Sequence, residues 1–243
     1  MNRNTFYIPS IDGLRAVAVC LVLLFHAGFE SFSGGFIGVD IFFVISGFLI
    51  TTNILREQEE KDSFSFGSFY QKRVARLFPA LFIVMVITLI SSYYILSPDD
   101  LAALGKSGLY ASLSTSNIYF WLSSGYFDSA SETKPLLHTW SLSVEEQFYL
   151  FWPAAIILLY RLKQKIAVII GLCFLSILSI AAALHFNKIY PEATFYLTPF
   201  RIYQFGFGAI LALLPQVSKH TTKGALSLAS ILALLLLNYQ LDG

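Results

Sequence analysis

Two ionisable side chains interrupt an otherwise apolar run near the start of the chain. Arg15 and His26 lie within LRAVAVCLVLLFHAGF, eleven positions apart. Eleven residues are close to three helical turns, so in a helix both side chains occupy one face, roughly 16 Å apart along the axis. Imidazole titrates near neutral pH and can take a proton from a hydroxyl, whereas a guanidinium binds phosphate. The pair therefore predicts two functional positions at different depths along one path.

Carboxylates and a further arginine fall inside or at the ends of other apolar segments. Asp40 lies in GFIGVDIFFVISGFL, Glu145 and Glu146 lie in WSLSVEEQFYLFW, and Arg201 opens the segment RIYQFGFGAILAL. Ionisable residues are rare in membrane helices and usually have a function. Consecutive residues of a helix point about 100° apart, so we expect at most one of the two glutamates to face the interior. Together with His26, these groups predict a polar site at one depth.

A basic cluster predicts a second site. The segment QKRVARLFP places Arg73 and Arg76 three residues apart, on one face if it is helical, with Lys72 beside them. Guanidinium groups bind phosphate in a bidentate manner. With Arg15, these residues would form a phosphate-binding layer near one membrane surface.

Each of these residues also has a structural interpretation, which the sequence leaves open. Arg15 can extend to the membrane surface, and the KRVAR run can anchor the chain on its cytoplasmic side. Asp40 and Arg201 can form an ion pair, and glutamates favour the start of any helix. We interpret as packing or loop residues Ser46, His138 and the glycines Gly34, Gly35, Gly38 and Gly47.

The composition defines the elements that must position these groups. Of the 243 residues, 56% are hydrophobic and 13% are charged, whereas a soluble domain is about a quarter charged. Mean hydropathy is +0.67. These values predict an all-α transmembrane helical bundle, and a net charge of +1 argues against nucleic-acid binding. Cys20 and Cys173 lie in apolar runs without zinc-type spacing, so we expect no metal site.

Apolar segments of suitable length predict about seven membrane spans in one domain, residues 1–243. They are 12–30, 37–55, 79–97, 142–160, 166–186, 199–215 and 223–239. The weakly apolar segment 98–121 is expected to be re-entrant or interfacial. A true crossing near 101–121 is the alternative.

Basic residues gather in the loops that follow the second, fourth and sixth spans. Because cytoplasmic loops carry an excess of Lys and Arg, the amino terminus is expected in the cytoplasm. Arg15 then lies near the inner surface and His26 in the outer half of the membrane.

Five ordered blocks resemble the membrane-bound acyltransferase family 3. YIPSIDGLRAVAVCLVLLFHAGF is similar to the family's opening, with its Arg-x10-His spacing, and GGFIGVDIFFVISGFLIT to its second-helix signature. FYQKRVARLFPAL resembles its Arg-x-x-Arg segment, and PLLHTWSLSVEEQFYLFWP resembles its Trp-Ser-Leu-x-x-Glu-x-Gln-Phe-Tyr block. TPFRIYQFGFGAILAL is similar to a later helix with a leading arginine. The resemblance spans nearly the whole chain.

The resemblance implies transfer of an acyl group, often acetyl, from cytoplasmic acyl-CoA to a hydroxyl of an envelope glycan such as the O-antigen of lipopolysaccharide. Acyl-CoA is then a donor substrate, with no bound cofactor, and the location is the bacterial inner membrane. Family members commonly have more spans, and some add an extracytoplasmic hydrolase-like domain, so we expect this chain to be truncated at its carboxyl end. Gln204 stands where members often have Glu, which argues against an acid–base role there.

For this reaction we predict His26 as the base, oriented by a carboxylate from Glu145, Glu146 or Asp40. The sequence does not rank the three. The predicted substrate-binding residues are Arg15, Arg73, Arg76, Trp140 and Arg201.

Two other classes of function remain open. A transporter of a glycan or acyl donor would also place charges within the membrane, although transporters often show internal repeats and none is apparent. A non-catalytic assembly subunit would tolerate replacement of the polar residues.

Overall fold

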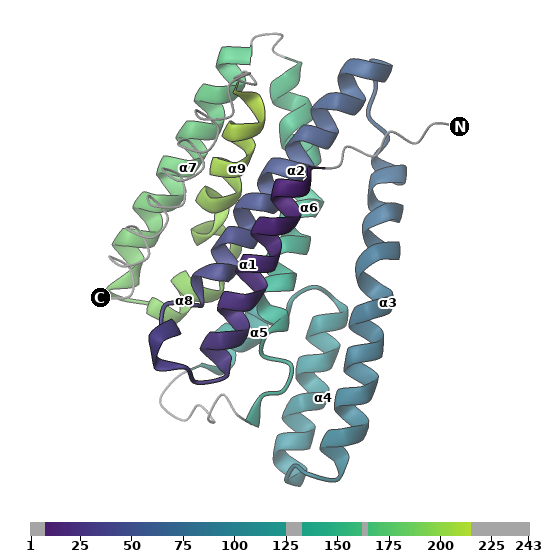
Figure 1. The fold of residues 1–243 in the computed structure, drawn as a ribbon, viewed down its shortest axis with the longest axis vertical. Coiled ribbons are helices and arrows are strands. Elements are labelled where there is room, and N and C mark those ends of the chain that lie inside the picture. Colours follow the sequence, from purple (N-terminus) through teal and green to yellow (C-terminus); the bar gives the residue numbers. More distant parts are fainter. Residues whose placement is uncertain (1–7, 125–132, 162–164, 215–243) are drawn as a thin grey trace.

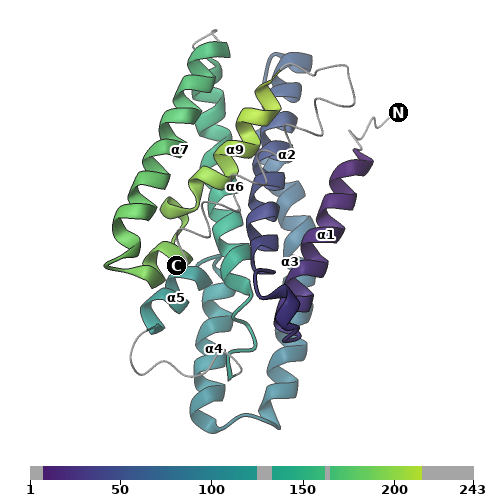
Figure 2. The same cartoon turned by 60° about the vertical axis from the view of Figure 1, so that its left-hand side comes forward.

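A computed structural model describes residues 8–124, 133–161 and 165–214 and folds them into helices. The long helices lie side by side along the longest axis of the molecule (Figures 1 and 2). The described ranges contain no β-strand, so the predicted all-α class is confirmed for them.

Within the described ranges, five helices are long and apolar enough to cross a membrane: α1 (Pro9–His26), α2 (Ile37–Lys61), α3 (Phe66–Tyr93), α6 (Thr139–Tyr160) and α7 (Lys165–Asn187). They correspond to the first five predicted spans. The sixth, α9 (Ile202–Leu213), is apolar but has 12 residues, so its length of about 18 Å falls short of a hydrocarbon core of about 30 Å. The seventh predicted span, 223–239, lies outside the described residues. A count of seven is therefore not confirmed.

The segment between α3 and α6 forms two short helices, α4 (Pro98–Ser112) and α5 (Ser116–Ser123). Ser97 caps α4 by accepting a hydrogen bond from the Asp100 amide at 3.2 Å. An uninterrupted crossing near 101–121 does not form, because the helix breaks after Ser112 and Ser114 adopts a positive φ of 56°. Figure 1 shows α4 running back along the last turns of α3, and α6 begins towards that same end of the bundle.

The helix α2 is the centre of the bundle and packs against α1, α6 and α9 (Figures 1 and 2). Phe43 of α2 stacks on Phe205 of α9 with ring centroids 4.8 Å apart. Phe205 in turn stacks on Phe148 of α6 at 4.0 Å. Since all three rings are buried, these helices share one aromatic core.

Glycines allow the backbones of α2 and α9 to approach closely. A Cβ atom at Gly47 would overlap the carbonyl oxygen of Phe205, and a Cβ atom at Gly208 would overlap that of Val44. Small residues permit this kind of contact between membrane helices. The predicted packing role of Gly47 is therefore confirmed.

The other three predicted packing glycines divide into two groups. Gly35 and Gly38 lie against the backbone of α1, at the carbonyl groups of Leu21 and Ala18. Their packing role is confirmed. Gly34 has no atom within 4 Å of the position of a Cβ, so the same prediction is wrong for this residue.

We predict that Gly208→Ala lowers the free energy of unfolding by about 1–3 kcal/mol, because the added methyl group forces α9 away from α2. Gly105→Ala in α4 is the matched control, since nothing lies within 4 Å of its Cβ position; it should be neutral or stabilise by about 0.5–1 kcal/mol. Thermal unfolding of the detergent-solubilised protein measures both. Equal unfolding temperatures for Gly208→Ala and the wild type would contradict the close packing.

Candidate functional site

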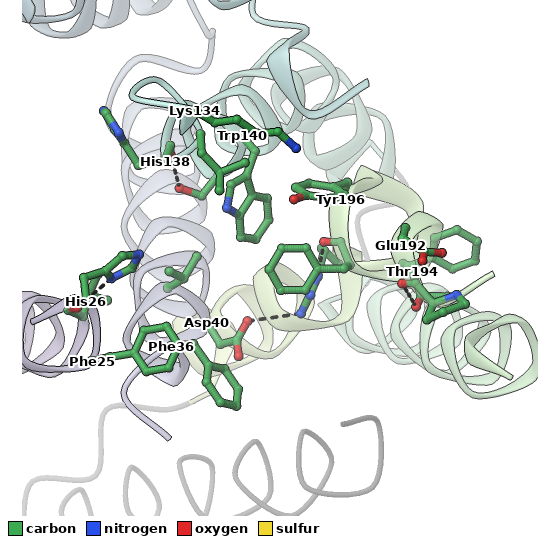
Figure 3. Close-up of a pocket in the computed structure, with 18 of the residues that line it drawn as sticks. Phe25, His26, Phe36, Asp40, Lys134, His138, Trp140, Glu192, Thr194 and Tyr196 are labelled. Carbon is green, nitrogen blue, oxygen red and sulfur yellow. Dashed lines mark hydrogen bonds and ion pairs between the residues drawn. The ribbon is translucent and has the colours of Figure 1, made fainter. Parts of the chain in front are cut away.

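A cavity of about 990 Å³ opens at the end of the bundle where α1 ends and α6 begins. Its walls come from α1, α2, the segment before α6, the end of α7, and the short helix α8 (Pro191–Tyr196). The volume lies in the range of small-molecule sites, about 300–1,000 Å³. Four predicted site residues from distant parts of the sequence line it, namely His26, Asp40, Trp140 and Arg201 (Figure 3).

His26 is the last residue of α1, and a backbone carbonyl holds its ring. Its Nδ1 lies 2.8 Å from the carbonyl oxygen of Val22. Because a carbonyl can only accept, Nδ1 carries the proton in the neutral ring and Nε2 keeps its lone pair. A carboxylate was expected in this orienting position, and the Val22 carbonyl occupies it instead.

Asp40 and Arg201 form a buried ion pair, with 3.4 Å between Arg201 Nη1 and Asp40 Oδ1. Gln204 Nε2 donates to the same carboxylate oxygen at 2.5 Å. The guanidinium also donates from Nε to the Phe195 carbonyl at 3.0 Å. The geometry favours the ion-pair interpretation of these two residues, although both border the cavity.

Trp140 faces the same arginine. The guanidinium carbon of Arg201 lies 5.8 Å from the Trp140 ring centroid and 5.1 Å from that of Phe195, within the range of cation–π contacts. Trp140 is 8% exposed, so it offers a ligand little more than a ring edge. Substrate binding by Trp140 and Arg201 stays a prediction.

Glu145 and Glu146 do not line the large cavity, contrary to the expected convergence with His26. Glu145 accepts short hydrogen bonds from the hydroxyls of Ser46 and Tyr149. Glu146 accepts one from Ser114 and borders a separate cavity of about 120 Å³. The expectation that only one glutamate faces the interior is wrong, because side chains about 100° apart can each reach a different neighbouring element.

The predicted basic residues gather away from His26. Arg73 lies with its guanidinium carbon 5.2 Å from the Tyr149 ring centroid, and its Nε is buried without a hydrogen-bond partner among the described residues. The positive charges of Arg76 and Arg15 and the negative charge of Glu145 all act on Arg73. Arg15 also pairs with Asp12 at 3.2 Å. These arginines form one cluster of positive charge towards the start of α1.

His138 lies in a turn, as predicted, but it also lines the large cavity, which was not predicted. The structure places His138 immediately before α6, with its side chain on the wall of the large cavity. The signal in the sequence is the TWSL motif, which contains the predicted site residue Trp140 and directly follows this histidine.

Comparison with known families agrees with the sequence blocks. Residues 8–241 match the family described as "Acyltransferase domain". The chain belongs to acyltransferase family 3. Since the match covers nearly all of the chain, the cavity, the histidines and the arginine cluster all lie within the family's domain.

Relatives with assigned names support this membership. The chain is 36% identical over 240 residues to the peptidoglycan O-acetyltransferase OatA of Listeria monocytogenes, covering 94% of this chain and 38% of that protein. It is 35% identical to the putative peptidoglycan O-acetyltransferase YrhL of Bacillus subtilis, over 88% of this chain and 36% of that protein. A putative O-acetyltransferase of Staphylococcus aureus is 34% identical, over 95% of this chain and 40% of that protein. The chain thus spans about two fifths of the length of these relatives, and no solved structure matches it.

We predict that Arg201→Met lowers the free energy of unfolding by about 3–5 kcal/mol, because it leaves the Asp40 charge buried without its cation. The double variant Asp40→Asn with Arg201→Met removes both charges and should recover much of this loss. Thermal unfolding in detergent gives the comparison. A double variant less stable than Arg201→Met alone would contradict the ion-pair role.

Proposed function

We propose that this domain transfers an acetyl group from acyl-CoA to a hydroxyl of a cell-envelope glycan, with peptidoglycan as the acceptor. The names of the relatives support acetyl transfer and favour peptidoglycan over the O-antigen of lipopolysaccharide. We also propose the bacterial inner membrane as its location, with the amino terminus in the cytoplasm, as the basic loops favour.

The geometry of His26 carries the proposal. Its Nδ1 is occupied by the Val22 carbonyl, and the residue lines a cavity that can hold a sugar. Nε2 is therefore the ring atom that can accept the proton of an acceptor hydroxyl. Attack of the oxygen on the thioester forms a carbon–oxygen bond and breaks the carbon–sulfur bond, and the proton on His26 then passes to the departing thiolate. The products are an acetyl ester and free CoA thiol.

The arginine cluster supports binding of the donor at the other end of α1. Acyl-CoA carries several phosphates, which bind guanidinium groups well. Arg73 keeps an unpartnered buried Nε, and Arg76 is exposed beside it. An anion held there lies on the proposed cytoplasmic side, whereas the sugar enters the cavity beside His26. The arm that joins the CoA phosphates to the thioester would extend through the bundle, so that the thioester lies beside His26 while the phosphates stay at the arginines.

We predict that His26→Ala lowers acetyl transfer at least about 100-fold, the usual contribution of a general base. The assay follows labelled acetyl from acetyl-CoA into base-labile ester on peptidoglycan, in membranes with equal amounts of protein. His185→Ala in α7 is the matched control, since His185 lies outside the cavity wall. Wild-type transfer by His26→Ala would refute the base assignment. Solute flux without any ester would instead support a transporter.

We predict that Arg73→Ala with Arg76→Ala raises the KM for acetyl-CoA about 10-fold or more, because each lost charge-assisted contact is worth about 1.5–3 kcal/mol. The KM for the glycan acceptor should stay within about twofold. Arg56→Ala is a suitable control, since Arg56 lies at the same end of the bundle and pairs with Glu60 at 2.6 Å. An unchanged KM for acetyl-CoA would exclude the cluster from donor binding.

A further inference from the structure

A second histidine shares the cavity with His26. His138 precedes α6, whereas His26 ends α1, so the two imidazoles come from elements far apart in the sequence. Figure 3 shows both on the same side of the cavity. Both residues are solvent-accessible, and the cavity they line gives a ligand access to them. The base of the proposed reaction needs only one of these rings, so the other calls for an explanation.

Short-range hydrogen bonds hold His138 in place. The Leu137 amide donates to the Lys134 carbonyl at 2.9 Å, and the Trp140 amide donates to the Leu137 carbonyl at 3.0 Å. Leu136, two residues before the histidine, is fully buried and anchors this turn in the core. The ring therefore projects from a fixed backbone, which is the condition for a side chain that positions a ligand.

The surroundings of His138 favour its neutral form. Enclosure by protein lowers the pKa of His138, a hydrogen bond to the Pro135 backbone partly offsets this, and the nearby His26 lowers it further. In the neutral ring one nitrogen carries the hydrogen. The other nitrogen is left as an acceptor. Both histidines thus have, in the neutral form, one ring nitrogen that can accept.

A sugar offers the complementary groups. Each free hydroxyl of a sugar can donate a hydrogen bond, and two acceptors on one cavity wall suit two such hydroxyls. If His26 receives the hydroxyl that is acetylated, the second acceptor is available to another hydroxyl of the same sugar. A fixed second contact restricts how the ring can turn, and this restriction orients the reacting oxygen.

We propose that His138 binds the glycan acceptor by accepting a hydrogen bond from a second sugar hydroxyl, and so positions the first hydroxyl at His26. This inference rests on the proposed function. It makes His138 a positioning residue for the acceptor, with no part in proton transfer or in binding of acyl-CoA.

The test compares His138→Ala and His138→Gln with the wild-type protein in membranes, using acetyl-CoA and a soluble N-acetylglucosamine oligomer as acceptor. One neutral hydrogen bond contributes about 0.5–1.5 kcal/mol, so His138→Ala should raise the KM for the oligomer up to about tenfold. The kcat should fall as well, because the reacting hydroxyl is less well oriented, but by much less than the roughly 100-fold expected for His26→Ala. The KM for acetyl-CoA should stay within about twofold. His138→Gln, which keeps an accepting oxygen, should recover part of the loss, and His185→Ala should change nothing.

Monodeoxy derivatives of the oligomer sharpen the test. For one derivative, the one that lacks the hydroxyl bound by His138, the KM with the wild type should equal the KM of the full oligomer with His138→Ala. Combining this derivative with His138→Ala should raise the KM no further. Additive losses for every derivative, or a kcat that falls as far as in His26→Ala, would overturn the inference. If the wild type transfers no acetyl to any glycan, the proposed function itself fails. If the wild type is active and His138→Ala has the same kcat and KM for the oligomer, only the role of His138 is rejected.

Discussion

The buried ion pair between Asp40 and Arg201 holds together the elements on which the cavity depends. Asp40 belongs to the first turn of α2, and Arg201 directly precedes α9. The same guanidinium binds the Phe195 carbonyl of α8 and faces Trp140 of α6. Separating buried charges costs several kcal/mol, so these four helices must keep their relative positions. The wall opposite α1 is therefore rigid where the cavity needs a fixed shape.

Further along α2 and α9 from the ion pair, close packing of backbones and rings, and not charge, holds the two helices together. Gly47 and Gly208 bring the backbones of α2 and α9 into contact, and the stacked Phe43 and Phe205 fill the space beside them. Carbonyl-to-backbone packing of this kind tolerates little sliding, because any shift along the axis replaces a glycine with a larger side chain. The register of α2 against α9 thus also fixes Asp40 opposite Arg201.

The sequence predicted the long apolar helices well, but not the direction in which side chains point across the bundle. Apolar length identified the first five spans, and Asp40 and Arg201, which were predicted to lie at the level of His26, line the same cavity as this histidine. Glu145 was assigned to the same level and yet lies against Ser46. Its direction depends on how α6 rotates against α2, a contact between residues 99 positions apart. The place of His138 on the cavity wall was not predicted for a related reason, since a short apolar turn has no periodicity that reveals its buried side.

The hydrogen bond between His26 and the Val22 carbonyl also affects how well this imidazole could act as a base. A carboxylate partner, as in a triad, stabilises the charged imidazole that forms when an amide or ester is attacked. The Val22 carbonyl fixes the ring without supplying a full negative charge. In the proposed reaction with a thioester this is sufficient, because a thiol has a pKa of about 8.5 and leaves as a thiolate with little help from an acid. The demand on His26 is then to remove one proton from a well-positioned hydroxyl. Precise placement of the acceptor sugar matters more in such a site than a strong base, and the walls of the cavity are built from the elements that the ion pair makes rigid.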